Sequence, residues 1–61
     1  MFTRTTATDA IETAIENGGA ATAAEFDVDA IADDIYEATG TWNVDDIDAG
    51  DFWTIVEKHA K

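Results

Sequence analysis

The chain has 61 residues, which is enough for a single domain, 1–61, and no more. Its 14 acidic residues face only 3 basic ones, for a formal net charge of -11. Direct binding of nucleic-acid phosphates by basic side chains is therefore excluded, and anionic membranes repel the chain. The absence of cysteine and the presence of one histidine exclude disulfides and His-rich or thiolate metal sites.

The first helix is expected over about 6–17, with Thr6 or Thr8 capping its start. Apolar residues recur there at helical spacing and form one stripe, with acidic residues opposite. The stripe holds Ala7, Ala10, Ile11, Ala14 and Ile15, and the opposite side holds Asp9, Glu12 and Glu16. Gly18 and Gly19 predict a stop with positive φ. The alanine-rich stretch 20–25 stays open between a loop and a short helical turn.

The second helix is expected over about 28–39. Asp27 is a good N-cap, and Phe26 and Ile31 are placed to form a hydrophobic staple across it. The buried stripe should consist of Val28, Ile31, Ala32 and Ile35. Gly40 predicts the end of the helix, because glycine readily adopts the left-handed conformation that terminates helices.

The third helix is expected over about 49–60, capped by Asp48 and stapled by Ile47 and Phe52. Its last residues include Lys58 and Lys61, whose charge suits a helix carboxyl end. The segment before it repeats the aromatic–Asx–Val–Asp–x–Ile pattern that opens the second helix. This repeat favours a short helical turn near 44–47, and the alternative is an extended segment over 41–44.

The predicted fold is therefore all-α, a small bundle of three main helices. Hydrophobic residues make up 46% of the chain, and they include isoleucine and aromatic residues but no leucine. We expect isoleucine and most aromatic side chains to form the core. Tyr36 and Trp53 sit at the margins of their helical stripes, so they are candidates for an exposed apolar contact and for a homodimer.

The predicted functional feature is an anionic interaction face. Residues four apart on a helix lie about 6 Å apart along its axis, so the second helix should carry a row of carboxylates, followed by a dense cluster before and within the start of the third. These residues are Asp29, Asp33, Glu37, Asp45, Asp46, Asp48 and Asp51. Such an array can imitate phosphates and bind a basic protein surface. The alternatives are that the charge serves only solubility or adaptation to high salt.

An enzyme is not expected. The chain has neither Ser nor Cys to act as nucleophile, and His59 is interpreted as a part-buried residue at a helix carboxyl end. The run from Asp45 to Asp51 fits no register of a calcium-binding loop. No metal or cofactor is therefore predicted.

The stretch 31–59 resembles small uncharacterised proteins encoded by phages of actinobacteria. The similar segments are Ile-Ala-Asp-Asp-Ile-Tyr at 31–36, Gly-Thr-Trp at 40–42 and Asp-Phe-Trp-Thr-Ile-Val-Glu-Lys-His at 51–59. The resemblance implies a phage or prophage product that binds and modulates a host protein. The sequence shows no apolar run of about 20 residues and no secretory signal, so a cytoplasmic location, in the host cell, is expected.

Overall fold

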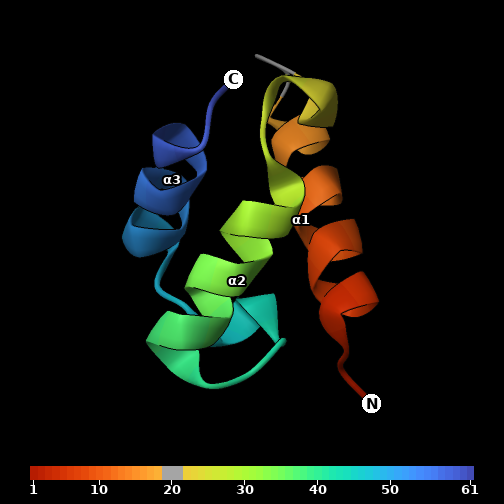
Figure 1. The fold of residues 1–61 in the computed structure, drawn as a ribbon, viewed down its shortest axis with the longest axis vertical. Helices are drawn as coiled ribbons and strands as arrows, with labels where there is room; N and C mark the ends of the chain where they lie inside the picture. The colour runs from red at the N-terminus through yellow and green to blue at the C-terminus, as the bar shows by residue number, and fades with distance from the viewer. Residues whose placement is uncertain (19–21) are drawn as a thin grey trace.

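The computed structural model describes residues 1–18 and 22–61. The fold is all-α, as predicted. Its elements in chain order are α1 (Arg4–Asn17), the 3-10 turn η1 (Ala23–Glu25), α2 (Val28–Thr39), the 3-10 turn η2 (Val44–Asp46) and α3 (Ala49–Lys58). Helix α2 lies between α1 and α3 and packs against both (Figure 1).

Helix α1 begins two residues before the expected start at 6. The Thr3 hydroxyl accepts a hydrogen bond from the Thr6 amide, and the Thr6 hydroxyl accepts one from the Thr3 amide. This reciprocal capping satisfies free amides of the first turn and extends the helix beyond its apolar stripe. At the other end Gly18 has φ -68°, so the predicted positive φ is wrong for this residue, and Gly19 lies outside the described residues.

Helix α2 has the predicted bounds. The Asp27 carboxylate accepts a hydrogen bond from the Ala30 amide at 3.2 Å, which caps the start. Gly40 has φ 77° and donates its amide hydrogen to the Tyr36 carbonyl at 2.7 Å. Both ends of α2 are therefore set by the residues that directly flank the helix.

The segment after α2 turns helically rather than extending. The Asn43 side chain accepts a hydrogen bond from the Asp45 amide at 3.1 Å, and η2 follows at once. The predicted turn near 44–47 is confirmed, and the extended alternative is wrong.

Helix α3 ends at Lys58, two residues before the expected end at 60. The backbone then leaves the helix to bond with the segment preceding α2. The Asp27 amide donates to the His59 carbonyl at 3.0 Å, and the Lys61 amide donates to the Glu25 carbonyl at 2.8 Å, around an isolated antiparallel bridge between Phe26 and Ala60. The second bond satisfies the Lys61 amide, which a longer helix would have paired with a carbonyl four residues earlier.

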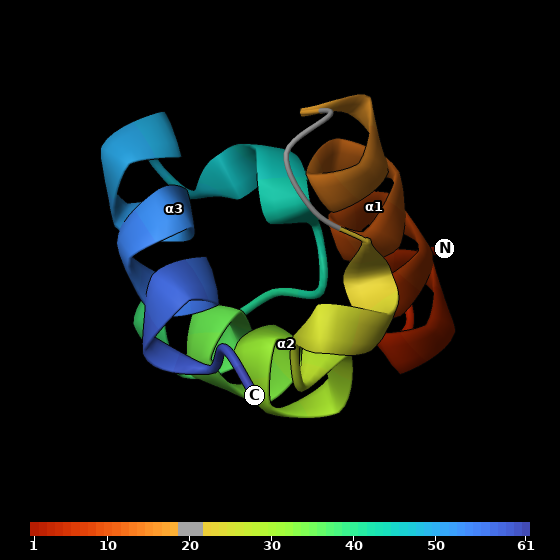
Figure 2. The same cartoon turned by 90° about the horizontal axis from the view of Figure 1, so that it is seen from above.

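The core lies at the centre of a ring formed by the three helices and η2 (Figure 2). Its buried members are Ala7, Ile11, Ile15, Ile31, Ala32, Ile35, Phe52 and Val56. Isoleucine dominates, as predicted, and each fully buried isoleucine stabilises the fold by about 1.5–3 kcal/mol. Among the aromatic residues Phe52 is buried, and Phe26 and Trp42 are half-buried and pack against the core, whereas Tyr36 and Trp53 are exposed, as predicted. No helix among the described residues has the length and apolarity needed to span a bilayer.

Candidate functional site

The acidic side chains lie on the surface with little neutralisation. Within residues 1–18 and 22–61, no charged or polar residue is buried. Only Asp33 and Asp34, of the fourteen acidic residues, take part in ion pairs in this part of the chain. Three basic residues cannot balance this charge, so the surface potential is strongly negative.

The expected row of carboxylates on α2 is interrupted. Asp29, Asp33 and Glu37 are all exposed, but the Asp33 carboxylate accepts a hydrogen bond from the Arg4 guanidinium. Arg4 comes from α1, and no pattern in the sequence indicates this pairing. The row is therefore two separate charges, Asp29 and Glu37, with a neutralised pair between them.

Arg4 also contacts an aromatic pair. Its guanidinium carbon lies 5.3 Å from the centroid of the Trp42 ring, within the range of a cation–π interaction. The Trp42 ring in turn packs on Tyr36, with 4.3 Å between the ring centroids. Tyr36 is thus exposed at 41% but held against the fold on one side.

A concave acidic surface joins residues of α1 and of the start of α2 that are distant in the sequence. A depression of about 500 Å³ lies between α1, η1 and the start of α2. Its acidic lining residues are Glu12, Glu16, Asp27 and Asp29, and Lys61 is the basic residue beside them. Of these four, the sequence prediction named only Asp29 as a site residue. Glu12 and Glu16 are four residues apart on α1, so the sequence predicts that they are neighbours. Asp29 lines the same depression only because α1 packs on α2.

The predicted cluster of Asp45, Asp46, Asp48 and Asp51 is exposed, yet part of it serves the helix. The Asp48 carboxylate accepts a hydrogen bond from the Gly50 amide at 3.0 Å, and Asp51 lies in the first turn of α3. Both positions favour negative charge because helix amides point toward them. Asp45 differs, since it lines two depressions beside α1.

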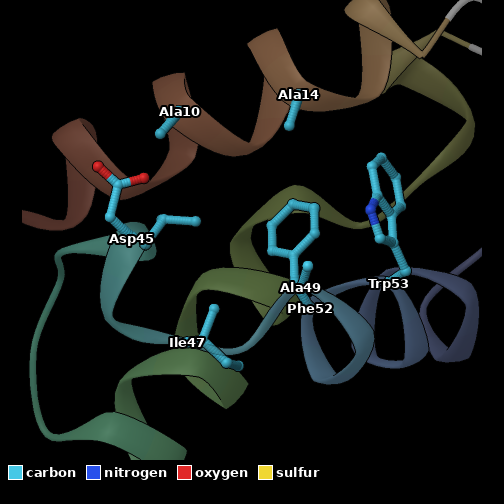
Figure 3. Close-up of a pocket in the computed structure, with 8 residues that line it drawn as sticks. Ala10, Ala14, Asp45, Ile47, Ala49, Phe52 and Trp53 are labelled. Carbon is cyan, nitrogen blue, oxygen red and sulfur yellow. The ribbon is translucent and has the colours of Figure 1, made fainter.

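One of these depressions is an apolar groove between α1 and the η2–α3 segment, with a volume of about 300 Å³. Ala10 and Ala14 point into it from α1, and Phe52 and Trp53 rise toward it from α3 (Figure 3). Val44, Ile47 and Ala49 complete its apolar lining. Ala10, a member of the apolar stripe of α1, is exposed where it borders this groove.

The second predicted apolar contact residue, Trp53, is exposed at 43%. Its ring packs edge-on against Phe52, with 4.9 Å between the centroids. Tyr36 and Trp53 therefore contact different aromatic neighbours, Trp42 and Phe52.

His59 is half-buried, as predicted, and has a carboxylate partner. Its Nε2 atom lies 2.6 Å from Asp34 Oδ2, and Lys58 Nζ lies 3.8 Å from the same oxygen. The hydrogen bond to His59 lowers the pKa of the Asp34 carboxyl despite its partial desolvation, and the charges of His59 and Lys58 add to this effect. The pair joins α3 to α2 and accounts for His59 structurally.

No group of His, Asp or Glu that could hold a metal ion occurs among the described residues. No known protein family matches the chain, and neither a curated protein nor a solved structure matches it.

Proposed function

We propose that this chain is a non-enzymatic interaction protein that binds a basic surface of a partner protein through its acidic surface. The observation that carries this proposal is the depression where Glu12 and Glu16 of α1 meet Asp27 and Asp29. Residues of α1 and of the start of α2 line it together, so the packing of the two helices, rather than a flexible tail, sets where these acidic residues lie.

More specifically, the protein would act as a nucleic-acid mimic. Lys and Arg side chains that bind phosphates would meet carboxylates held by the fold instead, and cations near these carboxylates would be released on binding, as they are from a nucleic acid. The resemblance to small actinobacterial phage proteins supports a search for this partner in an actinobacterial host cell. Binding there would interfere with a host protein that handles DNA or RNA.

The test is affinity capture from an actinobacterial extract on the immobilised protein, followed by elution with a salt gradient. Captured protein should elute between about 50 and 500 mM salt, and added duplex DNA should compete for it. The variant Glu12→Gln/Glu16→Gln/Asp29→Asn should release the partner at lower salt than the wild type. The control variant Asp9→Asn/Glu37→Gln/Glu57→Gln removes the same charge from exposed positions outside the depression. Retention that is insensitive to salt, or equal loss in both variants, contradicts binding at this depression.

A second candidate is self-association through exposed aromatic residues, with the charge serving solubility. The exposure of Tyr36 and Trp53, at 41% and 43%, favours it. Two copies would each bring a net charge of -11, so association should require salt to screen their repulsion. Sedimentation across a concentration series at low and high salt tests this alternative, and a monomer under all conditions contradicts it.

A further inference from the structure

We infer that the apolar groove between α1 and the η2–α3 segment docks a cationic, amphipathic helix of a partner protein. This site is distinct from the acidic depression of the proposed function. Ala10 and Ala14 line the groove, whereas Glu12 and Glu16 line the depression. The two surfaces therefore lie on different flanks of α1.

The apolar groove extends beyond the hollow of about 300 Å³ described above. A second, smaller hollow of about 80 Å³ continues it toward the amino end of α1 and shares Ala10, Val44 and Asp45 with it. On α1 the combined lining runs from Thr6 through Ala10 to Ala14. At 1.5 Å per residue these positions span about 12 Å, which matches apolar side chains at i, i+4 and i+7 of a docked helix.

The walls suit a helix as occupant. Ala10, Ala14 and Ala49 are small, so the backbone of a docked helix can approach closely, and its own larger side chains can fill the space. Aromatic residues mark the two ends. Phe2 lines the smaller hollow and is exposed at 54%, and Trp53 lines the larger one and is exposed at 43%.

Trp53 is held in place rather than free. Its ring packs against Phe52, and a Cβ atom at Gly18 would lie 3.9 Å from Trp53 Cη2. The ring therefore reaches from α3 to the carboxyl end of α1. A large aromatic surface that is already ordered costs little conformational entropy on binding, as in protein-interface anchors.

Charge selects the occupant. The Asp45 carboxylate lies beside α1 in the groove (Figure 3) and belongs to both hollows. Asp46 and Asp48, next to groove residues in the chain, are exposed. A docked helix with Lys or Arg beside its apolar stripe would pair with these carboxylates. A second copy of this chain would instead bring a further charge of -11 and be repelled.

The experiment titrates the ¹⁵N-labelled protein with two synthetic helical peptides of about 14 residues. Both carry the same lysines, but one has leucines at i, i+4 and i+7 spacing and the other has alanines there. The leucine peptide should bind at least about tenfold more tightly, because its leucines leave water. Its binding should shift the amide signals of Ala10, Ala14, Ala49 and Trp53 and the Trp53 indole signal.

Variants locate the binding. Ala10→Phe places a ring in the groove from an exposed position and should reduce leucine-peptide affinity roughly tenfold, whereas Ala38→Phe, at an exposed helical position outside the groove, should not. Asp45→Asn should weaken binding by up to about fivefold. Circular dichroism checks that each variant keeps its helices.

The remaining outcomes overturn the inference in different ways. Equal binding of both peptides, with shifts around Glu12 and Glu16, rejects the groove but leaves the acidic-surface function standing. Groove shifts that grow with protein concentration alone identify a second copy as the occupant. Equal affinity for an uncharged leucine peptide removes the role of charge. If neither peptide binds at low salt, the groove and the proposed affinity for basic surfaces both fail.

Discussion

His59 Nε2 and Asp34 Oδ2 lie 2.6 Å apart, although 25 positions separate the two residues in the chain. This hydrogen bond fastens the residue that caps α3 to the middle of α2. Next to it, the His59 carbonyl accepts the Asp27 amide hydrogen. The end of the chain is therefore secured by both the side chain and the backbone of one residue.

Asp34→Asn should lower the free energy of unfolding by about 1 kcal/mol near neutral pH, because it removes a charge-assisted hydrogen bond. The pKa of Asp34 is lowered in the folded state from its usual 3.8. A depressed carboxyl pKa stabilises the fold above the unfolded-state value, and this stability is lost as pH falls through the folded-state value. The difference between wild type and variant should thus shrink below about pH 4. Urea unfolding at several pH values measures it. Asp46→Asn is the control, and a difference that grows on acidification contradicts the assignment.

Ile31→Val should lower the free energy of unfolding by about 1 kcal/mol and Ile31→Ala by about 2–5 kcal/mol. The Ile31 side chain is fully buried, and truncation leaves a cavity between helices. A domain of this size has little stability to lose, so Ile31→Ala should be largely unfolded at 25 °C, as seen by far-ultraviolet circular dichroism. Thr13→Ala, at an exposed position of α1, should unfold like the wild type. Near-native stability of Ile31→Ala would show that α2 packs differently.

Gly40→Ala should lower the free energy of unfolding by about 1–2 kcal/mol. Gly40 has φ 77°, and a Cβ atom there would meet nothing within 4 Å, so the cost comes from the backbone conformation alone. Gly40→Asn should cost less, since asparagine tolerates this region. Gly40→Asn is therefore the comparison, because it adds a larger side chain at the same position. A loss for Gly40→Asn as large as that for Gly40→Ala in thermal unfolding would refute the backbone explanation.

Sodium chloride at about 1 M should raise the Tm relative to about 10 mM, because it shortens the screening length from about 30 Å to about 3 Å. The repelling groups are the unpaired surface carboxylates. Stabilisation by about 1 kcal/mol corresponds to roughly 4–8 °C in a domain of this size. The variant Glu12→Gln/Glu16→Gln/Asp29→Asn should respond less, since it lacks three of these charges. A Tm that stays constant or falls with salt would show that repulsion is not a significant cost.

The bounds of α2 and the turn at η2 could be predicted because the deciding contacts are local. Asp27 reaches an amide three residues away, and Gly40 adopts a conformation that glycine permits intrinsically. The start of α1 was harder to predict from the sequence, because the capping residue Thr3 lies outside the apolar stripe. The end of α3 depended on backbone bonds to residues near the start of α2, which no local pattern indicates.

For the candidate sites, local periodicity determined that the carboxylates face solvent, because a helix places its polar residues on the side opposite its apolar stripe. Which carboxylates lie near one another depended on the tertiary structure. Packing of α1 on α2 joined Glu12 and Glu16 to Asp29, and the same packing paired Arg4 with Asp33.

By itself, then, the sequence determined the helices, the isoleucine-rich interior and the excess negative charge of this protein. These properties depend on residue type and on spacing within one helix. Only the tertiary structure decided that Ala10 borders an open groove, that Trp53 closes its end and that Asp34 holds His59. Each of these depends on how separate helices cross, and the crossing is set by the fit of side chains that are distant in the chain.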